Sequence, residues 1–253
     1  MKKRLVVANW KMNPGTLAEA RVLFSKTRQV ALRLEQVETI ICPPFPYLGV
    51  FAHSGTTRVR LGAQDVFSQN GGRCTGEVSP EMLRDLGVSH VIVGHSERRA
   101  LGESDELVAK KVKAVLAEGM TPIVCIGEKE RDMEGHYFGI LKTQLLASLA
   151  SVRKSDFRNL VIAYEPLWAI GKSARDAMSP QGIRETEIFI RKVLADAVGA
   201  ETAQMPTVLY GGAVEEENAA AILREGEVGG FLVGHASLES DEFIKILRSA
   251  DAI

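Results

Sequence analysis

The chain has 253 residues, of which 45% are hydrophobic and 25% are charged, and its formal net charge at pH 7 is -1. This composition is typical of a globular protein with a large core, and the balanced charge gives no indication of a nucleic-acid-binding surface. Three scattered cysteines without Cys-x-x-Cys spacing argue against a disulfide framework and favour a reducing, cytoplasmic compartment. No apolar stretch approaches the roughly 20 residues of a membrane span, so we expect no membrane partner.

Short β-rich segments alternate with helical patterns along the whole chain. The predicted strands are near-continuous apolar runs, as expected for parallel strands buried on both faces. They cover residues 4–8, 39–42, 59–63, 90–93, 122–126, 160–164, 207–210 and 230–233. After the first strand, apolar residues follow Thr16 at helical spacing, and Glu19 completes a capping box with it. Helical periodicity returns at 108–116 and 183–197.

Only the segment 64–79 is a long connection without a predicted helix or strand. Loops of this length are uncommon within compact domains and are usually functional. Strand–helix units repeated over about 250 residues favour one (β/α)8 barrel domain spanning residues 1–253. A doubly wound open sheet is the alternative, because βα alternation alone does not establish closure.

Candidate functional residues follow the ends of the predicted strands, where a barrel places its active site. An amide, an ammonium, an imidazole, a carboxylate and two glycine-containing turns are found there. These groups suit proton transfer next to the carbonyl of a phosphorylated substrate. They are Asn9, Lys11, His95, Glu165, Gly211-Gly212 and Gly234-His235.

The context of Glu165 is the most informative. Pro166 supplies a rigid hinge, Trp168 an apolar anchor and Gly171 a flexible tip, so the following segment has the features of a lid. A carboxylate in this setting suits a general base that meets a substrate and is then shielded from water.

Each candidate also has an ordinary structural interpretation. Taken alone, Lys11 is explained equally well as a solvated loop lysine. A histidine such as His95 more often has a structural role, with its hydrogen bonds satisfied inside the fold, than a catalytic one. Glu97 is more readily an ion-pair partner than a catalyst. Gly171-Lys172-Ser173 resembles the end of a phosphate loop, but Pro166 stands where that motif needs a glycine.

Taken together, eight short motifs resemble those of the triosephosphate isomerase family. They occur in the family order and span nearly the whole chain. They are ANWKMN (8–13), GAQ (62–64), TGE (75–77), VGHSERR (93–99), CIGE (125–128), AYEPLWAIG (163–171), YGG (210–212) and LVG (232–234).

The resemblance implies a single-domain TIM barrel that interconverts dihydroxyacetone phosphate and D-glyceraldehyde 3-phosphate through an enediol(ate), in glycolysis and gluconeogenesis. Glu165 would be the base and His95 the electrophile that polarises the carbonyl. Ser96 and Glu97 would support His95 by opening a short helix whose N-terminus disfavours the imidazolium.

The remaining roles also come from the resemblance. Lys11 would stabilise the negative charge of the substrate and the enediolate, with a hydrogen bond from Asn9 near the same oxygen. Backbone N–H groups would hold the phosphate at Gly171, Ala213, Gly234 and His235. The segment 64–79 would form a homodimer through Thr75 and Glu77. No metal or organic cofactor would be needed.

The chain departs from the family pattern around the expected phosphate site. Ala213 replaces the usual serine, His235 replaces the second glycine of the last turn, and the lid between Gly171 and Pro180 is longer and lacks an expected glycine. We expect His235 to keep a turn that tolerates positive φ, to offer its N–H to the phosphate, and to point its side chain along the pocket rim.

Two other functions are weighed against isomerisation. A Schiff-base aldolase or lyase needs a buried strand-end lysine, for which Lys11 is the candidate. A catalytically inactive barrel kept for binding would be expected to lack Glu165, His95 or Lys11, and all three are present.

Overall fold

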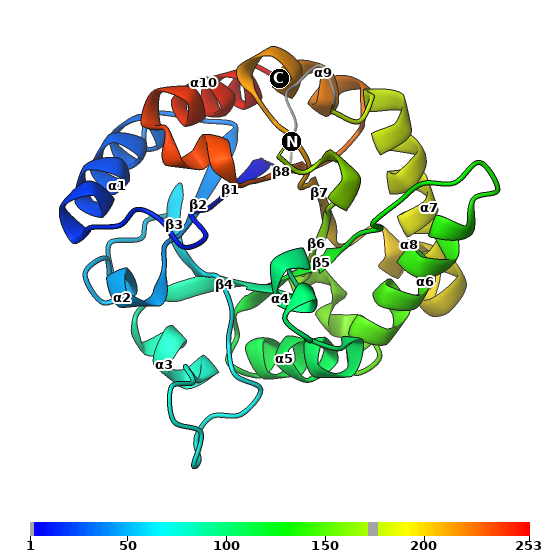
Figure 1. Ribbon diagram of the computed structural model, residues 1–253, viewed down its shortest axis with the longest axis horizontal. Coiled ribbons are helices and arrows are strands. Elements are labelled where there is room, and N and C mark those ends of the chain that lie inside the picture. Colours follow the sequence, from blue (N-terminus) through cyan, green and yellow to red (C-terminus); the bar gives the residue numbers. More distant parts are fainter. Residues whose placement is uncertain (1–2, 172–176) are drawn as a thin grey trace.

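Eight parallel strands form a closed barrel in sequence order, with β1 paired to both β2 and β8 (Figure 1). The structure is a computed structural model that describes residues 3–171 and 177–253. The strands are β1 (Arg4–Asn9), β2 (Val37–Cys42), β3 (Val59–Ala63), β4 (Val88–Val93), β5 (Thr121–Ile126), β6 (Val161–Tyr164), β7 (Thr207–Tyr210) and β8 (Gly230–Val233). Closure confirms the (β/α)8 prediction and excludes the open doubly wound sheet.

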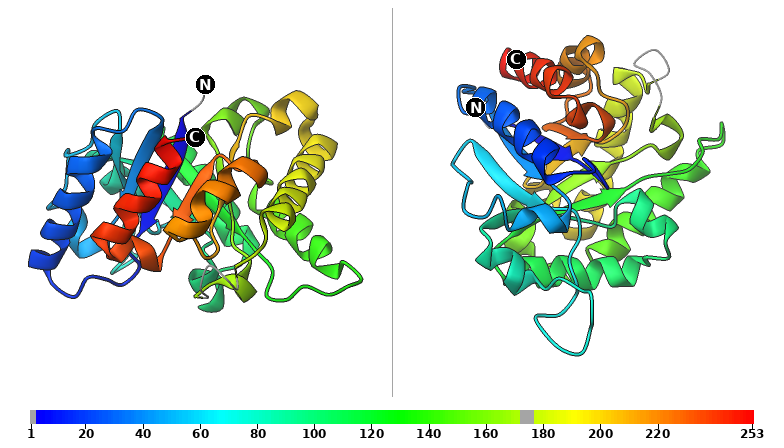
Figure 2. Two further views of the ribbon diagram at one scale, coloured as in Figure 1. Left: turned by 90° about the horizontal axis from the view of Figure 1, so that it is seen from above. Right: turned by 60° about the vertical axis from the view of Figure 1, so that its left-hand side comes forward.

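Helices surround the barrel and cover its outer face (Figures 1 and 2). The α-helices are α1 (Leu17–Ala31), α2 (Phe45–Leu48), α3 (Pro80–Asp85), α4 (Ser96–Ala100), α5 (Asp105–Ala117), α6 (His136–Ser148), α7 (Pro180–Val198), α8 (Ala200–Ala203), α9 (Glu216–Glu225) and α10 (Ser240–Asp251). Short 3-10 helices are η1 (Lys154–Asn159), η2 (Leu167–Ala169) and η4 (His235–Leu238). Within the described ranges, no helix combines the length and apolarity needed to cross a membrane.

The strands bury side chains on both faces, which explains their apolar sequences. Along β1, Leu5 and Val7 belong to one buried cluster and Val6 and Ala8 to another. Successive strand residues point to opposite faces, so the smaller cluster fills the barrel and the larger one lies under the helices. Gly62 in β3 leaves room inside, because a Cβ there would lie 2.5 Å from Cys42 Sγ.

Local signals in the sequence account for the first helix and the long loop. The Thr16 side chain accepts a hydrogen bond from the Glu19 N–H, and the Glu19 carboxylate accepts one from the Thr16 N–H, which confirms the capping box of α1. The segment 64–79 contains neither helix nor strand, as predicted. It projects away from the barrel as the cyan loop before α3 (Figure 2, right).

Candidate active site

The predicted catalytic and phosphate-binding side chains surround one pocket of about 390 Å³ at the carboxyl ends of the strands. Residues far apart in the sequence meet there because parallel strands of a closed barrel all end at the same rim. The predicted residues in its lining are Asn9, Lys11, His95, Glu165, Gly171, Ala213, Gly234 and His235. The structure therefore brings together every residue that the sequence assigns to catalysis or phosphate binding.

Glu165 and His95 form a buried pair in this pocket. The Glu165 Oε1 and His95 Nε2 atoms are 3.1 Å apart, and the two residues are 2% and 6% exposed. The second carboxylate oxygen of Glu165 accepts a hydrogen bond from the Ser96 N–H at 3.1 Å. Burial opposes ionisation of Glu165, but His95, the Ser96 N–H and Lys11 together hold its pKa below the usual carboxyl value. Glu165 is thus held in the ionised form, which is the form that a general base needs.

The predicted short helix after His95 is present as α4, with His95 at its N-cap. His95 Nδ1 accepts a hydrogen bond from the Glu97 N–H at 3.2 Å, which places the ring proton on Nε2. The net pKa shift is opposite to our expectation. Burial is the largest single influence and lowers the pKa of His95, but the charge and hydrogen bond of Glu165 at Nε2, together with the Glu97 carboxylate, raise it overall. The difference arises because the sequence did not indicate that Glu165 contacts the imidazole directly.

Lys11 reaches the pocket from a strained backbone conformation. Its φ is 51°, in the left-handed region that few non-glycine residues adopt, and such outliers concentrate at functional sites. Its Nζ lies 2.7 Å from Glu97 Oε1, and its backbone N–H donates to Asn9 Oδ1 at 3.0 Å. A Cβ at Gly234 would lie 3.2 Å from Lys11 Cε, so glycine there leaves space for the lysine side chain. Glu97 is thus an ion-pair partner as well as part of α4.

The turns after β7 and β8 also line the pocket. A Cβ at Gly212 would lie 2.3 Å from the Tyr210 hydroxyl oxygen, and one at Gly211 would lie 3.0 Å from Glu165 Cγ. Glycine at 212 is therefore required by the close approach of Tyr210, and glycine at 211 leaves room for the Glu165 side chain.

His235 is exposed, begins η4 and lies in the pocket lining, which agrees with a side chain at the rim. The expected backbone conformation was wrong. His235 is not among the described non-glycine residues with positive φ, and Gly234 has a φ of -90°. The turn is the start of a 3-10 helix, a right-handed conformation that any residue can adopt.

Two carboxylates that the sequence analysis missed also line the pocket: Glu215, before α9, and Glu242, in α10. Burial and the nearby Glu215 raise the pKa of Glu242. Neither follows a strand directly, so a search for polar residues at the ends of predicted strands could not find them. Their positions in the pocket depend on how α9 and α10 pack in the closed barrel.

The lid begins as predicted but is only partly described. Its first turn is η2, and Trp168 Nε1 donates to the buried Glu128 carboxylate at 2.9 Å. The predicted tip residue Gly171 is described and has a φ of 75°, whereas the departures from the family pattern at 172–176 lie outside the described residues. Thr75 and Glu77 do not line the pocket; both are exposed on the projecting loop 64–79.

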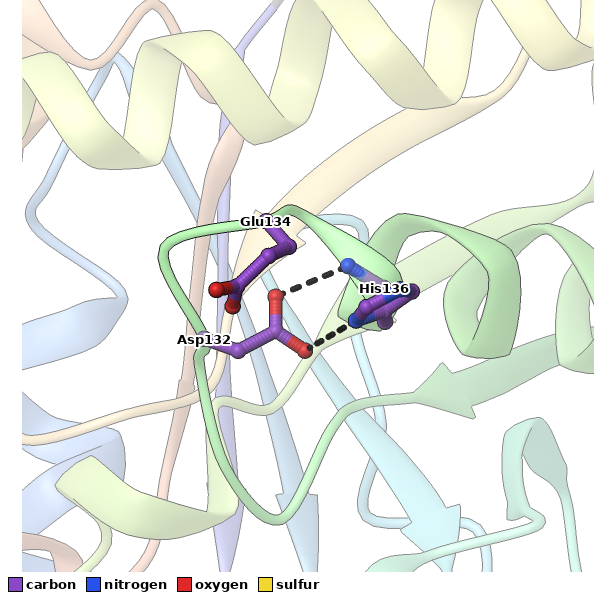
Figure 3. Close-up of side chains that lie close together, drawn as sticks. All are labelled: Asp132, Glu134 and His136. Carbon is purple, nitrogen blue, oxygen red and sulfur yellow. Dashed lines mark hydrogen bonds and ion pairs between the residues drawn. The ribbon is translucent and has the colours of Figure 1, made fainter.

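One group with possible metal-ligand atoms occurs in the described part of the chain, although the sequence spacing predicts none. Asp132, Glu134 and His136 offer atoms within 4.8 Å of one another, and all three are exposed (Figure 3). Asp132 accepts the His136 backbone N–H at 2.8 Å, and its other oxygen lies 3.2 Å from His136 Nδ1. Gly135, at the N-cap of α6, has no side chain that could accept a hydrogen bond from the start of the helix. Asp132 accepts one instead, so the arrangement is explained as a helix cap.

Comparison with known proteins gives one consistent result. The family model described as triosephosphate isomerase matches residues 4–250. A protein of Dehalococcoides mccartyi strain CBDB1 named triosephosphate isomerase is 42% identical over 263 residues, covering 100% of this chain and 98% of that protein. Proteins of the same name from Roseiflexus castenholzii and Symbiobacterium thermophilum are 41% and 43% identical, covering 98% and 99% of this chain and 98% of each protein.

Proposed function

This chain belongs to the triosephosphate isomerase family, and from that premise we propose that Glu165, His95, Lys11 and Asn9 carry out its reaction. The enzyme interconverts dihydroxyacetone phosphate and D-glyceraldehyde 3-phosphate, an aldose–ketose isomerisation. The observation that supports the residue assignment is the Glu165–His95 pair, buried at 3.1 Å in a pocket that Lys11 also lines.

The proposed reaction moves one proton between neighbouring carbons. Glu165 takes the proton from C1 of the ketose, and the electron pair passes into a C1–C2 double bond with negative charge on the C2 oxygen. His95 donates a hydrogen bond from Nε2 to that oxygen. Transfer of a proton between the two oxygens and return of the carbon proton to C2 give the aldehyde. The proton thus ends within the same molecule.

Glu165 and His95 separate during this sequence. The Nε2–H that now faces Glu165 is the same one that has to reach the substrate oxygen, so the carboxylate moves from the imidazole to the carbon. This movement takes away the main group that raises the pKa of His95, and the weaker contribution of the Glu97 carboxylate remains. The burial of His95 and the Glu97 N–H on its Nδ1 persist, and both favour the neutral ring.

Charge on the substrate is balanced from two sides. The Lys11 ammonium and the Asn9 amide face the developing enediolate. Backbone N–H groups at Gly171, Ala213, Gly234 and His235 suit the phosphate, since all four residues line the same pocket. No step in this scheme requires a metal or an organic cofactor.

The assembly that we infer is a homodimer through the loop 64–79. Thr75 and Glu77 are exposed on this loop. Large apolar side chains are also exposed on the segments that follow β1 to β4; they are Met12 (92%), Phe45 (37%), Met82 (57%) and Leu101 (81%). Because β1 to β4 are neighbours in the barrel, these side chains lie on adjacent connections, which supports an interface on this side of the molecule. We further infer one domain over residues 1–253, a cytoplasmic location, and use in gluconeogenesis as well as glycolysis.

A coupled assay with glyceraldehyde 3-phosphate tests the assignment of the base. Glu165→Gln keeps the shape of the side chain and removes the base, so kcat should fall by roughly 10²–10⁴-fold. The KM should change much less, because the proposed phosphate contacts lie elsewhere. A variant that turns over at nearly the wild-type rate would exclude Glu165 as the base. Schiff-base chemistry at Lys11 would instead give a covalent adduct on borohydride reduction, which we do not expect.

A further inference from the structure

A buried polar cluster lies next to the lid hinge, centred on Glu128, which is 0% exposed. Three donors converge on its Oε1 atom: the Tyr164 hydroxyl at 2.7 Å, Trp168 Nε1 at 2.9 Å and Arg131 Nε at 2.9 Å. A buried carboxylate costs free energy unless it is paired and hydrogen-bonded. Arg131 is the cation that contacts it, so the charge of the cluster depends on this residue.

The Arg131 guanidinium joins several structural elements. Its Nη2 donates to the Tyr164 hydroxyl at 3.0 Å and to Thr186 Oγ1 at 2.6 Å. Its Cζ lies 4.5 Å from the centre of the Tyr137 ring and 5.8 Å from that of Trp168. A single side chain thus contacts the end of β6, the start of the lid, α6 and α7. Only a planar, multi-donor group can make these contacts at once.

These contacts reach both ends of the lid and the strand that carries the base. Trp168 lies in the first turn of the lid, and α7, which holds Thr186, begins where the lid ends. The Tyr164 hydroxyl oxygen is 3.7 Å from Sδ of Met178, at the far end of the lid. Tyr164 immediately precedes Glu165, so a shift in the cluster is passed directly to the base.

We propose that Arg131 is a positioning residue for the isomerisation: it fixes Glu128, Tyr164 and Trp168 so that the lid hinge and Glu165 take up the geometry that the reaction needs. Arg131 does not line the substrate pocket and acts through these three residues. The inference rests on the proposed function of Glu165 and extends it to a residue in the β5–α6 loop.

The test compares Arg131→Met, Arg131→Lys and a matched control, Arg153→Met. Arg153 also forms an i,i+3 ion pair, with Asp156 at 2.8 Å, although here the arginine comes first, and its side chain is 82% exposed against 20% for Arg131. We expect Arg131→Met to lower kcat about tenfold and to change KM, since hinge changes affect both constants together. Arg131→Lys keeps the charge without the planar fork, so a smaller loss of kcat is expected. The control should match the wild type.

A purely structural role would lower the melting temperature but leave kcat and KM unchanged in protein that is folded by circular dichroism. That result for Arg131→Met would overturn the proposal. If Arg131→Met does not fold, the kinetics of Arg131→Lys test the proposal instead. Wild-type kcat and KM in the folded lysine variant would then overturn the proposal. Glu165→Gln is assayed in parallel: normal turnover in that variant would refute the proposed function itself, whatever Arg131 does.

Discussion

Glu165 is the main cause of the raised pKa of His95, so removing its charge should reverse the shift. In Glu165→Gln the carboxylate is lost, while the burial of His95 and the Glu97 N–H on Nδ1 remain. The Glu97 carboxylate, 3.7 Å from Nδ1, still favours the charged ring, but the two raising contributions of Glu165 are lost, so we expect the pKa of His95 to fall relative to the wild type. An NMR titration of the imidazole in both proteins measures this. An unchanged or higher pKa in the variant would mean that another group controls the protonation of His95.

His235 should contribute through its backbone rather than its imidazole. Its conformation is right-handed and its side chain is exposed at the rim, so His235→Gly can keep the same turn. We expect a KM within about threefold of the wild type, because the backbone donors are retained. His136→Gly is the control, since it removes an exposed histidine outside the pocket. A collapse of activity in His235→Gly alone would assign a role to the imidazole.

Residues at strand ends were predictable from the sequence, and residues placed by packing were not. Four site residues each follow a predicted apolar strand, which is where a barrel places its active site; they are Asn9, Lys11, His95 and Glu165. Glu242 and Arg131 have no such local marker. They reach the site or its hinge only after α10 and the β5–α6 loop have packed against the barrel.

The capping box at the start of α1 provides a test of helix stability. Thr16→Ala removes the acceptor for the Glu19 N–H, which should cost about 0.5–2 kcal/mol in the free energy of unfolding. Thr16→Ser is the control because it keeps the oxygen. Chemical denaturation followed by circular dichroism compares them. If the alanine and serine variants are equally stable, the capping bond makes no net contribution.

The centres of the strands were easier to predict than their beginnings. The predicted strands 39–42 and 90–93 begin at Val37 and Val88 in the structure. Their first residues include polar side chains that find partners on β3: Glu38 pairs with Arg60 at 2.5 Å, and the Ser89 hydroxyl donates to the Leu61 carbonyl at 3.2 Å. A search for apolar runs misses a polar strand residue whose ion-pair or hydrogen-bond partner lies on the neighbouring strand.

At the scale of the whole molecule, the homodimer is open to direct measurement. Light scattering at micromolar concentration should give twice the chain mass. Leu101→Asp places a charge on the proposed interface and should shift the protein towards monomer, because burying an unpaired charge is costly. Met133→Asp is the control, since Met133 is fully exposed in the β5–α6 loop. Fully active wild-type monomers would contradict the assembly.

Closure of the barrel between β1 and β8 also has a consequence for the time course of synthesis. Leu5 to Ala8 pair with Gly230 to Val233, so β1 gains its second neighbour only after β8 has been translated. At about 5–20 residues per second, roughly 10–45 s separate the two. Asn9 and Lys11 are therefore translated before the other proposed site residues but are held between two strands only once β8 has been made. A nascent chain halted before β8 carries Lys11, His95 and Glu165 but has no closed rim on which to assemble them.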